Sequence, residues 1–250
     1  MWFDNHCHLT TIDADPGEVV ATARAAGVTR LLTVGCTVAD SAAAANIAAG
    51  FDGVWATAGL HPHDADQGID GLAPLLDHPA VVAVGECGLD YHYDHSPRPL
   101  QVDAFERQIA LANEHDLALV IHTREAWDDT FAILDRAGTP ARTVFHCFTG
   151  GPDEADACVA RGASVSFSGI VTFPSAADVR QAARRVPLHR LLVETDSPYL
   201  APVPLRGTSN RPANVAVVGA FLADLLVVDA EELARRTTAN ALTLFDLPAD

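Results

Sequence analysis

Short apolar runs that end at polar residues recur along the whole chain, and they are the pattern that predicts the fold. Helix-like stretches separate them; in 100–114, for example, Val102, Phe105, Ile109 and Ala112 share one face of a helix. The predicted strands are 1–8, 30–36, 53–60, 80–89, 117–123, 143–148, 163–168 and 191–196. The predicted helices are 16–26, 100–114, 127–136, 153–161, 176–184, 215–226 and 229–243.

Eight strands alternating with helices, at about 31 residues for each unit (250 divided by 8), predict a (β/α)8 TIM barrel. The alternative is a doubly wound open sheet, but the glycine-rich phosphate-binding turn that usually follows its first strand is missing. Residues 202–212, rich in Pro, Gly and Asn, are expected to form a loop. Asp229 followed by Glu232 fits a helix cap. We therefore expect one barrel domain over residues 1–250.

Composition excludes several classes of protein. Apolar residues make up 49% and charged residues 20% of the chain, which is typical of a chain with a large core and not of disorder. No apolar run is long enough to cross a bilayer, and the polar start of the chain is unlike a secretory signal peptide. Five cysteines without a Cys-x-x-Cys pair suit a reducing cytoplasm, where we expect the protein.

The charge balance excludes a non-specific coat on nucleic acid or membrane, because the formal net charge is −17. An anionic substrate held at a local positive centre such as a metal ion remains compatible with it. All 16 basic residues are arginine. The lack of lysine excludes Schiff-base chemistry, a Walker-type lysine and a carbamylated lysine that bridges two metals.

Histidines gather where the predicted strands end, which is the end of a barrel that carries the chemistry. His78, His115 and His189 precede strands instead and belong to the opposite end. The histidines at or just beyond the strand ends are His6, His8, His61, His63, His92, His95, His122 and His146.

A metal centre is the interpretation that these residues favour. His6 and His8 are two positions apart on one strand, so both should face the barrel mouth. Glu86, His122, His146 and Asp196 each follow a further apolar run. Buried imidazoles and carboxylates are costly unless paired or ligated, so their convergence makes sense around metal. Six ligands exceed one tetrahedral site and predict two divalent ions bridged by a carboxylate; zinc or manganese is favoured, with nickel and magnesium admissible.

Two further carboxylates, Asp4 and Glu194, precede proposed ligands by two residues and should point the same way. Each is either a satisfied buried polar group or a carboxylate that orients a ligating histidine, and we expect the second. Cys7, Cys87 and Cys147 should face the helix layer and act in packing.

Loop residues at the mouth offer contacts to a substrate. Arg124 and Arg206 could bind phosphate or carboxylate groups bidentately, or could be merely solvated charges. Trp127, Tyr91 and Tyr93 could stack on a base or serve in packing.

The chain resembles the TatD-type metal-dependent hydrolases of the amidohydrolase superfamily in motifs that span nearly its whole length. These motifs are Asp-x-His-x-His at 4–8, Gly-Leu-His-Pro-His at 59–63, Gly-Glu-Cys-Gly-Leu-Asp at 85–90, Ile-His-Thr-Arg at 121–124, His-Cys-Phe-Thr-Gly at 146–150 and Glu-Thr-Asp-Ser-Pro-Tyr-Leu at 194–200.

The resemblance implies a barrel deoxyribonuclease with two divalent ions, Zn, Mn or Mg. It assigns one ion to His6, His8, Glu86 and Asp196, and the other to Glu86, His122 and His146. His61 and His63 would lie near the substrate phosphate. The family typically has Asn-Glu-Pro after the eighth strand, whereas this chain has Arg211 in place of the acid, so substrate preference does not transfer directly.

The function that the resemblance implies is hydrolysis of DNA phosphodiester bonds, at single strands or 3′ ends, as a 3′-5′ exonuclease. Asp196 would accept a proton from the attacking water, with Glu86 as the bridging carboxylate. We expect neither a membrane nor an obligate protein partner. The alternatives are an amidohydrolase-type lactone, amide or ester hydrolase, and a metal-binding scaffold without turnover.

Overall fold

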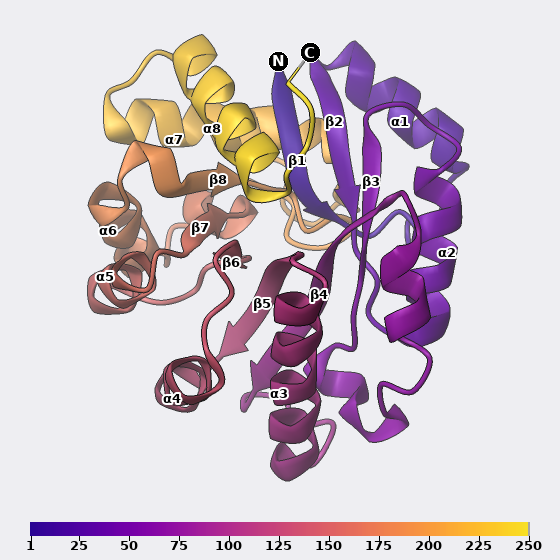
Figure 1. Ribbon diagram of the computed structural model, residues 1–250. Helices are drawn as coiled ribbons and strands as arrows, with labels where there is room; N and C mark the ends of the chain where they lie inside the picture. Colours follow the sequence, from indigo (N-terminus) through magenta and orange to yellow (C-terminus); the bar gives the residue numbers. More distant parts are fainter. Residues whose placement is uncertain (250) are drawn as a thin grey trace.

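The computed structural model describes residues 1–249, which form a barrel of eight parallel strands with helices around the outside (Figure 1). The strands pair in chain order, each with the next, as the predicted TIM barrel requires. Their bounds are β1 Trp2–Cys7, β2 Val28–Thr33, β3 Val54–Ala58, β4 Val81–Asp90, β5 Ala118–Arg124, β6 Thr143–Phe145, β7 Ser164–Phe167 and β8 Leu191–Val193. The predicted fold is confirmed.

The barrel closes between β1 and the segment that follows β8. Cys7 and Ser197 form a parallel bridge, and the His8 amide donates to the Ser197 carbonyl at 2.8 Å. The Asp196 amide donates to the His6 carbonyl at 2.9 Å. These bonds bring two predicted ligand segments, 188 residues apart in the sequence, into direct backbone contact.

Within residues 1–249, eight α-helices form the outer layer, together with five short 3-10 helices in the connections. Asp229 caps the last helix by accepting from the Glu231 and Glu232 amides, as its position predicts. The α-helices are α1 Pro16–Ala25, α2 Val38–Ala48, α3 Arg98–Glu114, α4 Trp127–Ala137, α5 Pro152–Ala160, α6 Ala177–Arg185, α7 Val215–Leu226 and α8 Ala230–Leu244. The 3-10 helices are η1 Pro62–Gln67, η2 Ala73–Asp77, η3 Gly169–Thr172, η4 Leu188–Arg190 and η5 Pro212–Asn214.

Two apolar layers hold the barrel together. The larger lies between the strands and the surrounding helices, and it includes Cys7 and Cys87, which face away from the barrel axis as expected. The smaller fills the barrel interior, where Phe3 packs 6.3 Å from Phe245, just beyond α8. Apolar side chains therefore fill the barrel interior below the histidines, and the histidine cluster lies above them at the mouth.

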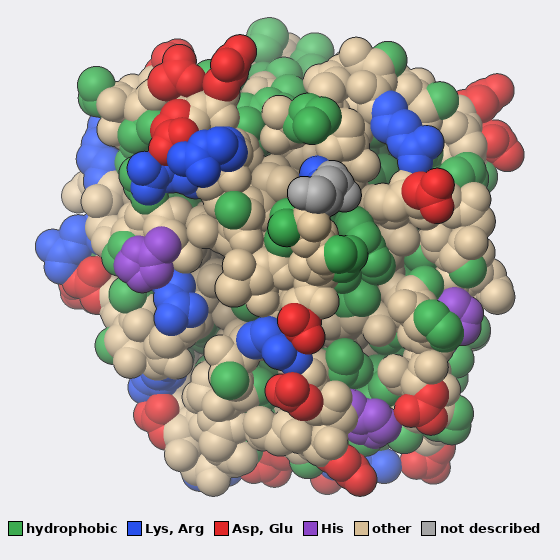
Figure 2. Space-filling view, turned by 45° about the horizontal axis from the view of Figure 1, so that its top comes forward, with side chains coloured by type: hydrophobic (Ala, Val, Ile, Leu, Met, Phe, Trp, Pro, Cys, Tyr) green, Lys and Arg blue, Asp and Glu red, His purple; other side chains and the backbone are tan. Residues whose placement is uncertain are grey.

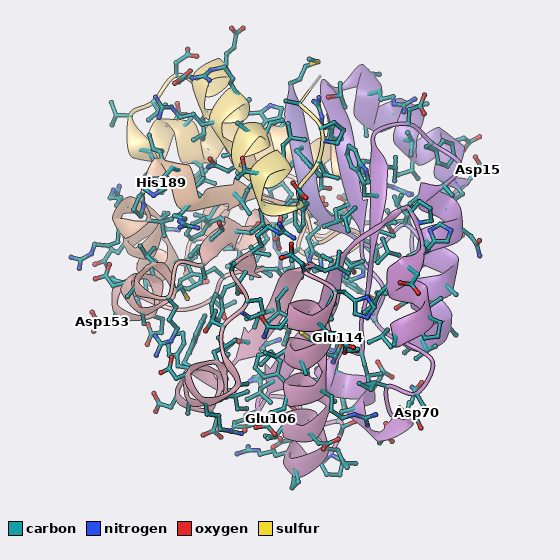
Figure 3. The ribbon with its side chains drawn as sticks, viewed as in Figure 1. Asp15, Asp70, Glu106, Glu114, Asp153 and His189 are labelled. Atoms are coloured by element: carbon teal, nitrogen blue, oxygen red, sulfur yellow. The ribbon has the colours of Figure 1, made fainter. Side chains whose placement is uncertain are left out.

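The two ends of the barrel differ in chemistry. Figure 2 faces the end where the strands begin, near the chain termini; its histidines are isolated, with acidic and basic side chains interspersed. The excess acidic charge is spread around the periphery, where Asp15, Asp70 and Asp153 lie (Figure 3). The histidine cluster lies at the other end, where the strands finish.

Two remaining expectations concern the chain as a whole. All five cysteines carry free thiols. Over residues 1–249, no single helix has both the length and the apolar character of a membrane span; residues 212–226 and 230–244 meet those criteria only as a pair bent by 112°.

Close packing of two glycines at the mouth yields a first prediction. A Cβ on Gly59 would lie 2.2 Å from the Gly85 carbonyl carbon, next to Glu86. Gly59→Ala must push β3 and β4 apart, so we expect a loss of about 1–3 kcal/mol in the free energy of unfolding, measured by denaturant titration. The control is Gly151→Ala, whose new Cβ meets the flexible end of Glu154 at 3.2 Å and Asp178 Cβ at 4.0 Å, an ordinary van der Waals contact. Equal stability of the two variants would contradict this packing.

Candidate metal centre at the barrel mouth

The site is built around one buried carboxylate, Glu86, which is only 3% exposed. β4 carries it into the mouth, and imidazoles from four other segments point their nitrogens at its two oxygens. The distances to the nearer oxygen are 2.7 Å from His146 Nε2, 3.0 Å from His122 Nδ1, 3.2 Å from His6 Nε2, 3.3 Å from His61 Nε2 and 4.0 Å from His8 Nε2.

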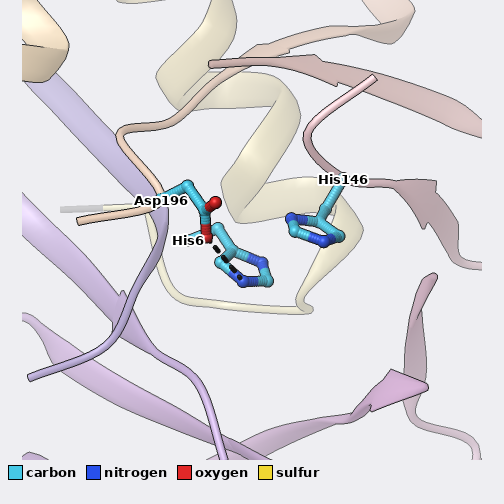
Figure 4. A group of neighbouring side chains, drawn as sticks. All are labelled: His6, His146 and Asp196. Carbon is cyan, nitrogen blue, oxygen red and sulfur yellow. Dashed lines mark ion pairs between the residues drawn. The ribbon is translucent and has the colours of Figure 1, made fainter. Parts of the chain in front are cut away.

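His6, His146 and Asp196 form one side of this cluster (Figure 4). The His6 and His146 rings stack with centroids 3.8 Å apart and planes 12° from parallel. Asp196 Oδ1 lies 3.7 Å from His6 Nε2 and 3.2 Å from His8 Nε2. Its side chain is 13% exposed, against 4% for Glu86, so Asp196 is the carboxylate that solvent reaches more readily.

Asp90 organises the other side of the cluster. Its Oδ2 lies 3.0 Å from both His122 Nε2 and His63 Nε2. Its Oδ1 accepts from the amides of His92 and Tyr93 at 3.0 and 2.9 Å. One buried carboxylate therefore fixes His122 and His63 and anchors the loop after β4.

Of the two carboxylates expected to orient ligating histidines, Glu194 lies against one. Its Oε1 is 3.2 Å from His146 Nδ1 and accepts from the Cys147 amide at 2.8 Å. The carboxylate of Asp4 accepts from the Thr195 amide and hydroxyl at 2.8 and 2.6 Å, and its role behind a ligating histidine stays a prediction. The pairing of β1 with β2 shifts register between Asp4 and Cys7, which breaks the alternation that placed Asp4 on the same side as His6.

The loop after β8 holds the Asp196 segment in place. Asn210 Nδ2 donates to the carbonyls of Thr195 and Tyr199 at 2.9 and 2.7 Å. The neighbouring Arg211, which replaces the acid of the resembled family, has a buried Nη1 without a hydrogen-bond partner within residues 1–249.

The two arginines expected to contact substrate lie apart from the carboxylates. The Arg124 guanidinium lies 4.7 Å from the centroid of the Tyr93 ring, at the edge of the His63 side of the site. Arg206 is exposed and lies 4.1 Å from the Phe173 ring, beyond η3. No hydrogen bond or ion pair connects Arg206 to the histidine cluster in the part of the chain that the structure describes.

The electrostatics of the cluster centre on Glu86. Burial alone raises its pKa, but the surrounding imidazoles, foremost His146 and His61, hold the pKa well below its ordinary value. Burial lowers the pKa of His61 to about 4, so this ring is neutral near pH 7. His146 shows the reverse: burial lowers its pKa, but the charges of Glu86 and Glu194 outweigh burial and raise it. Glu86 is therefore ionised and attracts positive charge.

Several nitrogens at this centre are suited to a divalent cation. His6 Nε2 and His146 Nε2 are buried and have no hydrogen-bond partner within the described residues, although both lie beside Glu86. Such atoms are costly unless something binds them. Three groups have ligand atoms within 4.8 Å of one another: His6, His8 and Glu86; His6, His146 and Asp196; and His61, Glu86 and His122. This nitrogen and oxygen donor set fits zinc or manganese.

A TIM barrel with this donor set at its mouth defines the class of metal-dependent hydrolases, and comparison with known proteins gives the family. The family model "TatD related DNase" matches residues 3–246. The chain is 39% identical to "Uncharacterized metal-dependent hydrolase YabD" of Bacillus subtilis, over 98% of this chain and 99% of that protein. It is 38% identical to "3′-5′ ssDNA/RNA exonuclease TatD" of Pantoea vagans, over 98% and 99% of the two chains.

A solved structure agrees with these sequence relatives. The crystal structure of YJJV, a TatD homolog from Escherichia coli K12, matches with a TM-score of 0.93 and 30% identity, covering 99% of this chain and 98% of that one. The chain belongs to the TatD-related DNase family, and the expected class of metal-dependent hydrolase is confirmed.

Sequence reasoning assigned no role to three residues at the centre. Asp90 has a signal, because it lies four positions beyond Glu86 on the same strand and so shares its direction. Cys36, whose Sγ is 3.7 Å from His8 Nδ1, ends an apolar run. For Asn210, only its place in the Asn-Arg-Pro segment at 210–212 could have indicated a role. His61, which is expected near a substrate phosphate, has its Nε2 3.3 Å from a carboxylate oxygen of Glu86.

Asp90 provides a test of the hydrogen bonds behind the centre. Asp90→Asn keeps the shape but removes the charge that fixes His122 and His63, so we expect metal affinity to fall about 10- to 100-fold, measured by competition with a chelating dye. Asp94→Asn is the matched control, because exposed Asp94 in the same loop pairs with Arg98 and, among the described residues, with no histidine of the centre. If the two variants bind metal alike, Asp90 does not position His122.

Proposed function

We propose that the protein is a nuclease that hydrolyses phosphodiester bonds of single-stranded DNA, working from 3′ ends. The observation that carries the proposal is the cluster of five imidazoles around buried Glu86, with Asp196 beside it at the mouth. Family membership supports it, because a relative that matches over 98% of this chain and 99% of its own length is named a 3′-5′ ssDNA/RNA exonuclease.

We propose two divalent ions at the centre, both bound to Glu86. His6, His8 and Asp196 complete the first ligand set, and His122 and His146 complete the second. His61, which the sequence placed near the phosphate, is close enough to Glu86 and His122 to be a further ligand. Bound there, divalent ions would acidify a water molecule and neutralise charge that builds on the phosphoryl oxygens.

The residues of the chain supply the remaining parts of the reaction. Asp196 accepts the proton of the attacking water, because it borders the cluster and is more exposed than Glu86. Its pKa, which burial raises, is held below the ordinary value by the hydrogen bond and charge of His8, so it enters the reaction ionised. Glu194 holds the His146 ring, and Asp90 holds His122 and His63.

Binding of the anionic strand needs positive charge on a strongly acidic protein. Arg124 lies beside the His63 side of the centre, and no carboxylate within the described residues forms an ion pair with it. We propose that Arg124 contacts a substrate phosphate, together with His63. A contact between Arg206 and the substrate stays a prediction from the sequence alone.

Removal of metal tests the reaction class. Protein stripped by a chelator and reloaded with Zn, Mn or Mg is incubated with single-stranded DNA, double-stranded DNA, RNA, lactones and N-acyl amides. We expect cleavage of single-stranded DNA that disappears with the chelator and returns with metal. Turnover of lactones or amides alone would assign the centre to amidohydrolase-type chemistry. Turnover of none would indicate a metal-binding scaffold.

Replacement of the proton acceptor tests the mechanism. Asp196→Asn should lower kcat by about 100- to 10,000-fold, because the amide takes no proton from the attacking water. Metal content and thermal unfolding are measured on the same preparation, so loss of ligation or fold is recognised. Asp135→Asn, which removes only an exposed partner of Arg161, is the control. Undiminished turnover by Asp196→Asn at full metal occupancy would refute the role of Asp196.

A further inference from the structure

We infer that Tyr93, with His95 and Arg124 beside it, forms a subsite that stacks a nucleobase next to the phosphodiester bond at the metal centre. The inference rests on the proposed function, because it takes the substrate to be a single-stranded nucleic acid. It adds a binding surface, outside the proposed metal ligands, that recognises the base and not the phosphate.

The position of Tyr93 is fixed by the metal centre. Its backbone amide donates to Asp90 Oδ1 at 2.9 Å, and the other oxygen of Asp90 holds His122 and His63. Its ring meets the His63 ring edge-on, with centroids 5.5 Å apart and planes at 89°. Tyr93 therefore lies one ring beyond His63 on the rim of the same mouth.

The Tyr93 ring has no structural role comparable to that of the other two aromatic candidates. Tyr91 donates its hydroxyl to Asp129 at 2.7 Å, and Trp127 packs 5.2 Å from the buried Phe148 ring. Tyr93 is 50% exposed, and its hydroxyl has no hydrogen-bond partner within residues 1–249. An exposed, anchored ring of this kind is the feature on which unpaired bases stack.

His95, itself exposed, stacks in an offset arrangement on Tyr93, so the two rings form a short aromatic column on which a base can add a further layer. The two rings are 4° from parallel with centroids 5.4 Å apart, and the His95 ring also meets His63 at 89°. Two parallel rings thus stand perpendicular to His63, at the edge of the proposed phosphate site. Tyr199, 55% exposed and 5.9 Å from His8 on the other side of the mouth, has no parallel ring and no arginine over it among the described residues.

Arg124 gives this surface the charge that a nucleic acid needs. Its guanidinium lies over the Tyr93 ring, 4.7 Å from the centroid, and two acidic residues of the neighbouring loops contact other side chains, Asp94 with Arg98 and Glu125 with His92. A planar cation beside an aromatic ring can stack with a base and pair with the adjoining phosphate. In a chain with a net charge of −17, this combination selects a strand that presents both groups.

The test compares kinetic constants for Tyr93→Ala and Tyr93→Phe on two oligodeoxynucleotides, one intact and one with abasic residues at its 3′ end. For Tyr93→Ala we expect KM on the intact strand to rise about 5- to 100-fold, with kcat nearly unchanged. Tyr93→Phe keeps the ring and should behave as the unaltered protein. Leu100→Ala, which removes a 43% exposed side chain at the start of α3, is the matched control and should leave both constants unchanged.

The abasic strand separates stacking from other effects of the substitution. The unaltered protein should bind it less tightly than the intact strand, whereas Tyr93→Ala should not distinguish the two. The subsite is refuted if Tyr93→Ala has an unchanged KM, if its abasic penalty equals that of the unaltered protein, or if Tyr93→Phe loses as much as Tyr93→Ala.

A binding measurement keeps this test independent of turnover. Fluorescence anisotropy with phosphorothioate-linked versions of both strands reports Kd on the metal-loaded protein. If the protein binds the intact strand better than the abasic one through Tyr93 but cleaves neither natural strand, the subsite stands and the proposed nuclease function fails. If cleavage occurs without any difference in Kd between the strands, the function stands and the subsite is wrong.

Discussion

The burial of the Glu86 carboxylate among five imidazoles is the interaction on which the rest of the site depends. A carboxylate removed from water is destabilising by several kcal/mol unless positive charge or hydrogen bonds compensate it. Here His146, His122 and His6 lie within 3.2 Å of its oxygens, yet His6 Nε2 and His146 Nε2 have no hydrogen-bond partner in the described residues. The cluster is therefore only partly compensated by its own protons. A bound divalent cation satisfies the carboxylate and the orphaned nitrogens together.

The barrel meets this constraint by making many separate strand ends converge. Glycines at 59 and 85 let β3 and β4 approach closely where Glu86 enters the mouth, which brings His61 onto the carboxylate. Backbone bonds between the His6 and Asp196 segments close the barrel at the same level. Asp90 contacts Nε2 of His122 and Glu194 contacts Nδ1 of His146, the ring nitrogens that face away from Glu86. The orientation of both rings is therefore set before any ligand binds.

Much of this could be predicted from the sequence, because most strands are apolar runs with a polar residue at or just beyond their end. β6 and β8 end at Phe145 and Val193, so His146 and Asp196 lie just beyond the ladder, where side-chain alternation no longer constrains them. α2 was missed because Val38–Ala48 is mostly alanine and lacks an apolar stripe. The direction of Asp4 depends on a register shift in β1, and the approach of His61 to Glu86 depends on the spacing of β3 and β4; neither can be read from the local pattern of residues.

The central claim is that Glu86 and its imidazoles bind a divalent cation. Anomalous diffraction from crystals grown with manganese or zinc tests it most directly. The account predicts a peak about 2.0–2.3 Å from a Glu86 carboxylate oxygen and from the nitrogens of neighbouring histidines. An absence of any peak at the mouth under metal-replete conditions, or a peak whose ligands do not include Glu86, would contradict it.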